Sequence, residues 1–276
     1  MKFLYVVATL LLCAMTLGAD TLAIVPEVLT LDQITYQMDE HDLARSRSLV
    51  GYTCLRRYAM ENQRFHKKAE LSVRMTYAAP GHKKFEVLKE EGPAVLRQKV
   101  LRPMLEAEEE AGRDDIRPHT RIVSANYDFK LLGVESQQGR RAYLLEITPK
   151  TRNKFLMRGR VWVDAENFGI IRVEASPAQN PSLFIHNTQV VQQSSRFGDV
   201  WLPLFNHSNT DSFLFGHTEV TIDSWDYKIV ESKALRSLSS WLLGRLSSPN
   251  GNWAAALRPP RQADLTSHSR SEWQAQ

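Results

Sequence analysis

The sequence has few cysteines and little excess charge. Its 276 residues include two cysteines, Cys13 and Cys54. Because we expect Cys13 to be removed with an N-terminal signal, Cys54 has no partner for an internal disulfide, and we expect it to be a buried strand residue. The net charge is +4, and removal of Lys2 leaves 34 basic residues against 31 acidic ones. This excess is too small to indicate a nucleic-acid partner.

Catalytic motifs are also missing. The sequence contains no Gly-x-Ser-x-Gly elbow, phosphate-binding loop, dinucleotide fingerprint or His-Glu-x-x-His pair, so we expect neither a catalytic residue nor a cofactor. One cluster on neighbouring predicted strands has metal-ligating residue types: His186, His207, Asp211 and His217. Its spacing matches no ligand pattern, which favours solvent-facing histidines and no metal. The acidic run 106–115 is expected to solvate a surface.

Residues 1–19 have the order of a secretory signal peptide. Lys2 precedes the apolar run Phe3–Leu12, and the small residues near Ala19 suit cleavage. A retained anchor is the alternative, but the apolar stretch is shorter than the roughly 20 residues that span a bilayer. Leu12 stands before Cys13, where a lipoprotein signal peptidase needs a small residue. We therefore expect an exported, periplasmic chain without a lipid anchor.

Two helices are predicted. The first covers residues 32–47, with acidic residues early and Arg45 and Arg47 late, as the helix dipole favours. The second begins after Gly92-Pro93 and runs through Leu105, and Pro103 should bend or split it. Beyond residue 231 we expect a short amphipathic segment and then a disordered tail from 247 to 276.

Alternating apolar residues predict strands over the rest of residues 20–230, which we expect to form one domain. Arg56 interrupts the apolar positions of the first strand. The turn Asp164–Asn167 joins two strands into a hairpin. The predicted strands are 50–60, 71–77, 85–87, 127–131, 141–148, 154–164, 169–176, 183–192, 200–209 and 213–227.

Three motifs in a fixed order resemble the LolA-like family of outer membrane lipoprotein-sorting proteins. They are Gly159-Arg160-Val161-Trp162-Val163-Asp164, then Gly198-Asp199-Val200-Trp201-Leu202-Pro203, then the closing Asp226-Tyr227-Lys228. The resemblance implies an α+β, mostly antiparallel fold: a strongly curved, unclosed half-barrel sheet with helices covering its concave face. In the family, the apolar cavity between sheet and helices holds acyl chains of lipoproteins. The carriers also use an arginine to latch the cavity lid, and no local motif matches it to Arg45, Arg47 or Arg56.

Ten residues are candidates for the wall of such a cavity, because they alternate along strands with one apolar face. The alternative is that these side chains fill a closed core. The ten are Leu71, Val73, Met75, Tyr77, Phe85, Val87, Val161, Val163, Ile171 and Val173.

The sequence therefore predicts a non-catalytic periplasmic binding protein or chaperone for lipid or for the acyl chains of a lipoprotein. The alternative is a regulatory or scaffolding domain of the cell envelope that binds a protein partner, including a membrane-associated one, through the same fold.

Overall fold

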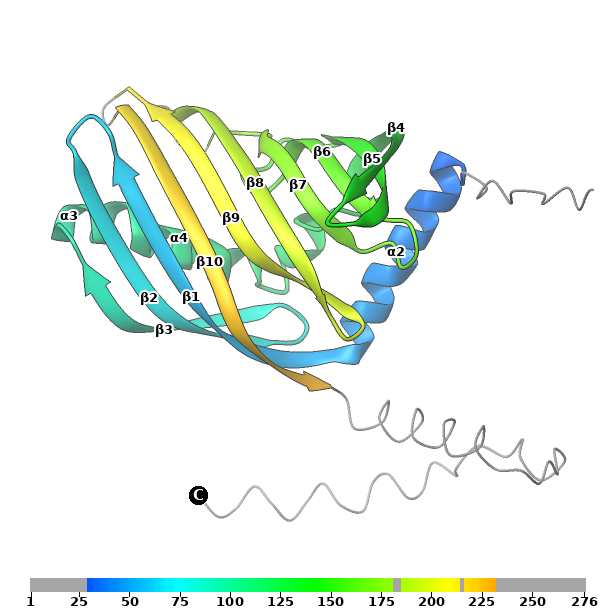
Figure 1. The fold of residues 1–276 in the computed structure, drawn as a ribbon, viewed down its shortest axis with the longest axis horizontal. Helices are drawn as coiled ribbons and strands as arrows, with labels where there is room; N and C mark the ends of the chain where they lie inside the picture. The colour runs from blue at the N-terminus through cyan, green and yellow to red at the C-terminus, as the bar shows by residue number, and fades with distance from the viewer. Residues whose placement is uncertain (1–28, 181–184, 214–215, 232–276) are drawn as a thin grey trace, which may run out of the picture.

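The computed structural model describes residues 29–180, 185–213 and 216–231 of the chain. Figure 1 shows a broad, twisted sheet with helices behind it and at one end. The predictions of a signal peptide over 1–19 and of an amphipathic segment and tail beyond 231 lie outside the described residues. None of the described helices is long and apolar enough to cross a membrane.

The helices and strands follow one another in a simple order. The N-terminal part contains α2 (Leu31–Ser48), β1 (Leu49–Asn62), β2 (Lys67–Ala78), β3 (His82–Glu91), α3 (Ala94–Leu96), the π-helical turn η1 (Arg97–Leu101), α4 (Arg102–Ala111) and the 3₁₀ turn η2 (Arg117–His119). The strands that follow are β4 (Tyr127–Gln137), β5 (Arg140–Pro149), β6 (Met157–Asp164), β7 (Ile170–Pro177), β8 (Ile185–Phe197), β9 (Val200–Ser212) and β10 (Gly216–Glu231).

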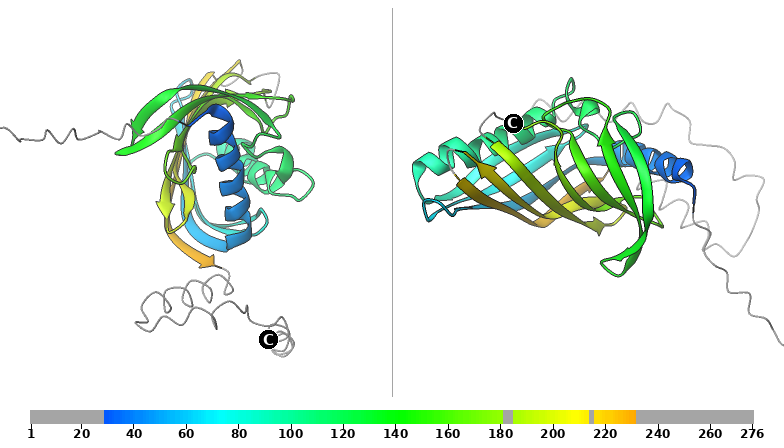
Figure 2. Two further views of the ribbon diagram at one scale, coloured as in Figure 1. Left: turned by 90° about the vertical axis from the view of Figure 1, so that its right-hand side faces the viewer. Right: turned by 90° about the horizontal axis from the view of Figure 1, so that it is seen from above.

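All ten strands form one antiparallel sheet in the order β3-β2-β1-β10-β9-β8-β7-β6-β5-β4. The meander from β4 to β10 joins the N-terminal meander through the pairing of β1 with β10. The edge strands β3 and β4 do not pair with each other, so the sheet stays open. Figure 2 shows its strong curvature, with α2 and α4 on the concave side. The fold class predicted from the sequence is confirmed.

Helix α2 begins at a capping box, in which Thr30 and Gln33 satisfy each other's backbone amides. Asp32 lies in its first turn and Arg45 and Arg47 in its last, as the dipole favours. Ile34 and Met38 are buried against the inner side of β5, β6 and β7. This half of the concave face is therefore covered by α2.

The second predicted helix is split, as Pro103 predicted. The π-helical turn η1 separates α3 from α4, and Pro103, which has no backbone N–H to donate, is the second residue of α4. Leu96, Leu101 and Leu105 line one side of this segment and pack on the inner face of β1 and β2.

The strand predicted from residue 154 begins at Met157, and one predicted break between two strands is wrong. Thr210 and Asp211 were expected to separate two strands, yet both belong to β9 and pair with β10. Strand β9 reaches Ser212 and β10 begins at Gly216. Polar residues such as these are common in turns, but they are also common on the solvent-facing side of an antiparallel strand. The sequence alone therefore does not distinguish the two.

Candidate functional site

The ten predicted cavity residues lie mostly in packed core. Leu71 and Val73 are fully buried beneath α3 and α4, and Val161 and Val163 beneath α2. Met75 and Tyr77 belong to a third cluster, with Tyr52 and Leu202. Phe85 and Val87 are half-buried beside the second cluster. Of the ten, Val173 is the one found in the wall of a concave cavity.

Ile171 differs from the prediction that it faces the helices. Val163 pairs with Ile170 and Trp162 with Arg172, so Ile171 is an extra residue in the β6–β7 ladder. Such a bulge shifts the side-chain alternation by one position. Ile171 therefore packs with Leu144 and Trp162, on the face opposite to Val161 and Val173.

Open space remains on the concave face between α2 and α4. A cavity of about 250 Å³ lies beside α2, and one of about 270 Å³ lies beside α4. Gln192 of β8 and Pro203 of β9 line both cavities, so the two adjoin. We call them together the concave groove.

The two ends of the concave groove differ in character. Near α2 its wall is largely apolar, with Met38, Phe168, Ile170, Val173 and Trp201. Near α4 its wall is polar, and it holds Arg56, Lys83, Glu108, Asn206 and Ser224. A cleft with this division suits a ligand that has both an apolar and a polar part.

A polar cluster fastens α4 over the inner face of β1. Glu108 of α4 accepts hydrogen bonds from Arg56 Nη1 at 2.9 Å, from the Tyr58 hydroxyl at 2.8 Å and from Lys83 Nζ at 2.9 Å. The Arg56 side chain is 5% exposed and that of Glu108 25%. These contacts join α4 to β1 and β3, and the same residues Arg56, Lys83 and Glu108 line the polar end of the groove.

The charges in this cluster stabilise one another. Burial alone would raise the pKa of Glu108, but Lys83 and Arg56 outweigh it and lower that pKa to about 2. Burial acts to lower the pKa of Arg56, and the charge of Glu108 more than compensates and raises it. Both groups are therefore charged at neutral pH.

Glu108 was not predicted as a site residue. It was expected to solvate a surface with the rest of the run 106–115, and that expectation is wrong for this residue. A signal was present in β1, where Arg56 interrupts an otherwise apolar stripe. A lone arginine on an inner face needs a carboxylate partner from the element that covers it.

The end of the groove near α2 carries further charges. Arg121 pairs with Asp42 of α2, and Arg45 and His41 lie on the same side of the helix. Burial, reinforced by Arg45, lowers the pKa of His41. This histidine is therefore neutral at pH 7, and the charged groups here are two arginines and one aspartate.

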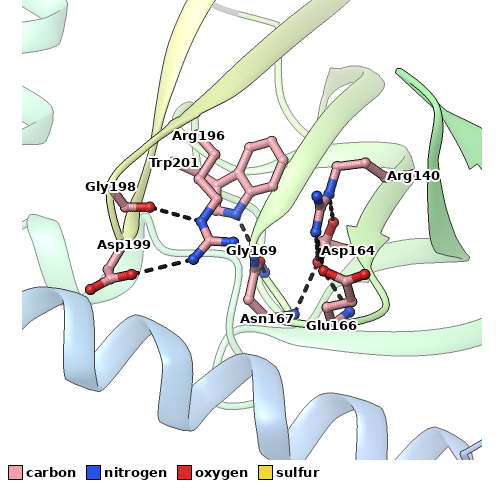
Figure 3. A network of polar contacts seen from close by, with 9 residues as sticks. All are labelled: Arg140, Asp164, Glu166, Asn167, Gly169, Arg196, Gly198, Asp199 and Trp201. Atoms are coloured by element: carbon pink, nitrogen blue, oxygen red, sulfur yellow. Dashed lines mark hydrogen bonds and ion pairs between the residues drawn. The ribbon is translucent and has the colours of Figure 1, made fainter. Parts of the chain in front are cut away.

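Figure 3 shows that the first two sequence motifs meet in a polar network beside α2. The carboxylate of Asp164 is fully buried, pairs with Arg140 and accepts backbone amides of Glu166 and Asn167 at 3.0 Å each. Asn167 in turn accepts the indole N–H of Trp201 at 2.8 Å. The network holds the β6–β7 turn against β9, so these motifs shape the wall of the groove.

The histidine cluster weighed in the sequence is partly dispersed. His217 Nδ1 donates to Oδ1 of Asp211 at 2.9 Å, which raises the pKa of His217, and His207 contacts Thr221 instead. The side chain of His186 lies outside the described residues. Among described residues, no group of three or more potential ligands is arranged to hold a metal ion.

A larger hollow, of about 440 Å³, lies over β10, β1 and β2 and is lined by charged side chains. Its cations are already paired, Arg57 with Glu70 at 2.8 Å and Lys68 with Glu61 at 2.9 Å. Few apolar side chains reach it. The concave groove is therefore the better candidate for a binding site.

No family model and no curated protein match the chain. Solved structures similar to it include a LolA superfamily protein of Nitrosomonas europaea, which is 14% identical with a TM-score of 0.41 over 75% of this chain and 97% of that one. An outer membrane lipoprotein-sorting protein domain of Vibrio parahaemolyticus is 11% identical, with a TM-score of 0.37 over 71% and 92%.

The MucA/MucB complex of Pseudomonas aeruginosa is also similar, at 9% identity and a TM-score of 0.26 over 70% of this chain and 93% of that one. These likenesses concern the fold alone.

Proposed function

We propose that the protein is an exported, non-catalytic binding protein that shelters acyl chains of a lipid or lipoprotein in the concave groove. The observation that carries this proposal is the open space between α2 and α4, where two adjoining cavities share Gln192 and Pro203. Export is inferred from the N-terminal sequence, in which Lys2 precedes an apolar run.

The energetics of such binding are favourable. Each acyl methylene that moves from water to an apolar wall contributes about 0.8 kcal/mol. The apolar end of the groove, with Met38, Phe168 and Trp201, supplies that wall. A pocket of a few hundred cubic ångströms takes a small ligand or part of a longer chain. Binding of this kind tolerates differences in chain chemistry.

A paired substitution on β8 tests the proposal. Gln192 lines both cavities, and neighbouring residues on a strand point to opposite faces. In Gln192→Trp a large ring occupies the groove, and in Gln193→Trp the same ring lies on the other face. We expect the native protein and Gln193→Trp to bind the apolar dye N-phenylnaphthylamine saturably, and Gln192→Trp to lose this binding while remaining folded.

The lipid content of the purified protein provides a second readout. We expect mass spectrometry of an organic extract to detect acyl lipid with the native protein and not with Gln192→Trp. Absence of both a saturable dye site and co-purified lipid in the native protein would refute the proposal.

A protein partner is the alternative, and the open edge of the sheet favours it. Leu132 and Val134 of the edge strand β4 are 44% and 37% exposed, and an edge strand offers unpaired backbone groups to another chain. A partner captured in stoichiometric amounts, lost in Val134→Lys and retained in Gln192→Trp, would support this function over lipid binding.

A further inference from the structure

The lining of the concave groove contains more positive than negative charge. Its cations are Arg45, Arg56, Lys83 and Arg121, and its carboxylates are Asp42 and Glu108. Arg121 faces Asp42, and Arg56 and Lys83 share Glu108. An anion within the groove would balance the excess charge.

Arg45 is the cation that lacks a partner. Within the described ranges, no carboxylate pairs with its guanidinium and no hydrogen bond to it is formed, although its backbone carbonyl accepts from Leu49. Its side chain is half-buried and lines the groove near α2. A guanidinium that lines a cleft without a counter-ion can bind an anionic group of a ligand, and such charge-assisted hydrogen bonds are stronger than neutral ones.

The position of Arg45 also fits such a role. Its charge acts on His41, one turn earlier in α2, and on Tyr52 of the inner face of β1. Arg56 acts on Tyr52 as well. Arg45 lines the same part of the groove as Met38, Phe168 and Val173, and Gln192 and Pro203 connect this part with the polar cluster around Arg56.

We propose that the ligand of the concave groove is an anionic amphiphile, with its chain on the apolar wall and its carboxylate or phosphate on Arg45. This inference rests on the proposed function, because it assumes that the groove takes an acyl chain. It adds a preference for negatively charged lipid over neutral lipid of the same chain length.

Displacement of N-phenylnaphthylamine at pH 8 tests the preference, with dodecanoate and dodecanol as ligands of equal chain length. We expect dodecanoate to displace the dye from the native protein at about tenfold lower concentration than dodecanol. In Arg45→Gln we expect dodecanoate to need the same concentration as dodecanol to displace the dye, while the concentration for dodecanol stays unchanged. In Arg45→Lys we expect part of the difference between the two ligands to remain. Inorganic phosphate alone should not displace the dye.

Arg160→Gln is the matched control, since Arg160 is exposed on β6 and lines neither cavity. Equal displacement by the two ligands from the native protein would overturn the anion preference and leave the proposed function standing. An equal loss of affinity for both ligands in Arg45→Gln would also overturn the anion preference, because the arginine would then act only on the shape of the groove. Failure of the dye to bind the native protein would overturn the proposed function itself.

Discussion

The indole N–H of Trp201 donates a 2.8 Å hydrogen bond to Oδ1 of Asn167, 34 residues earlier, and this contact joins the turn that follows the first sequence motif to the second motif (Figure 3). The same oxygen accepts the backbone amide of Gly169 at 3.2 Å. Trp201 also lines the apolar end of the concave groove. The contact therefore fixes a wall of the candidate site as well as the turn between β6 and β7.

Replacing Trp201 with phenylalanine should remove this hydrogen bond and keep most of the apolar contact. Trp201 is 7% exposed, so Oδ1 of Asn167 would lose its shorter hydrogen bond in a place that water hardly reaches and would keep only the one from the Gly169 amide. We expect a loss of about 1–2 kcal/mol in the free energy of unfolding, measured in urea. Trp225→Phe is the control, because Trp225 is 44% exposed, and an equal loss in both variants would contradict this role.

A methyl group at Gly169 should displace the same indole. A Cβ built at this glycine would lie 2.0 Å from Cδ1 of Trp201, whereas one at Gly133 would meet nothing within 4 Å. We expect Gly169→Ala to cost about 1–3 kcal/mol through this overpacking and to change the tryptophan fluorescence. Gly133→Ala should leave both the unfolding free energy and the spectrum nearly unchanged. An unaltered spectrum in Gly169→Ala would show that the indole does not pack against this turn.

The buried carboxylate of Asp164 should contribute a stability that depends on pH. Burial acts to raise its pKa, but Arg140 and the backbone amides of Asn167 and Glu166 outweigh this effect and lower it. Because the pKa of Asp164 is lowered by folding, its ionised carboxylate stabilises the fold fully above the unfolded-state pKa of about 3.9. This stabilisation is lost as the pH falls below that value.

We therefore expect Asp164→Asn to lower the unfolding free energy by about 2–4 kcal/mol at pH 7, because Arg140 loses its buried partner, and by less in acid. Glu166→Gln is the control, since Glu166 also contacts Arg140 but is 77% exposed. A loss in Asp164→Asn that does not change with pH would contradict an electrostatic origin.

The meander and α2 were predictable from sequence, because alternation along strands and the charges at the ends of 32–47 directly reflect burial and the helix dipole. The concave groove was not. Its lining includes Gln192, Asn206 and Ser224, polar residues at inward positions of β8, β9 and β10, which break the apolar alternation that marks a core. Cavity walls were sought among apolar stripes such as Leu71 and Val73, and those stripes are the parts that the helices cover closely.

The bulge at Ile171 was likewise hidden, because Ile171, Val173 and Ala175 alternate with Arg172 and Glu174 as in a regular strand, and only the cross-strand register shows the extra residue. Glu108 was hidden for a different reason. It lies in a run of charged residues of which it alone reaches Arg56 and Lys83, and the direction of one side chain on a short helix depends on how that helix packs.

The contact between Arg56 and Glu108 leads to a prediction on pH and stability. The pKa of Glu108, about 2 in the folded protein, lies below the value of about 4.3 expected in the unfolded chain. The contribution of the Glu108 carboxylate to the free energy of unfolding is thus complete above pH about 4.3 and is lost as the pH falls toward 2. We expect Glu108→Gln to cost about 2–3 kcal/mol at pH 7, less than for a fully buried pair because a quarter of this side chain is exposed.

Unfolding of the native protein, Glu108→Gln and Glu109→Gln in urea, measured between pH 2 and 7, checks this prediction. Glu109 is the neighbouring residue and is exposed, so its substitution should have little effect at any pH. The difference between the native protein and Glu108→Gln should shrink below pH about 4 and vanish near pH 2. A difference that persists undiminished at pH 2 would mean that the carboxylate charge does not hold α4 on the sheet, and that the packing of Leu101 and Leu105 beneath the helix suffices.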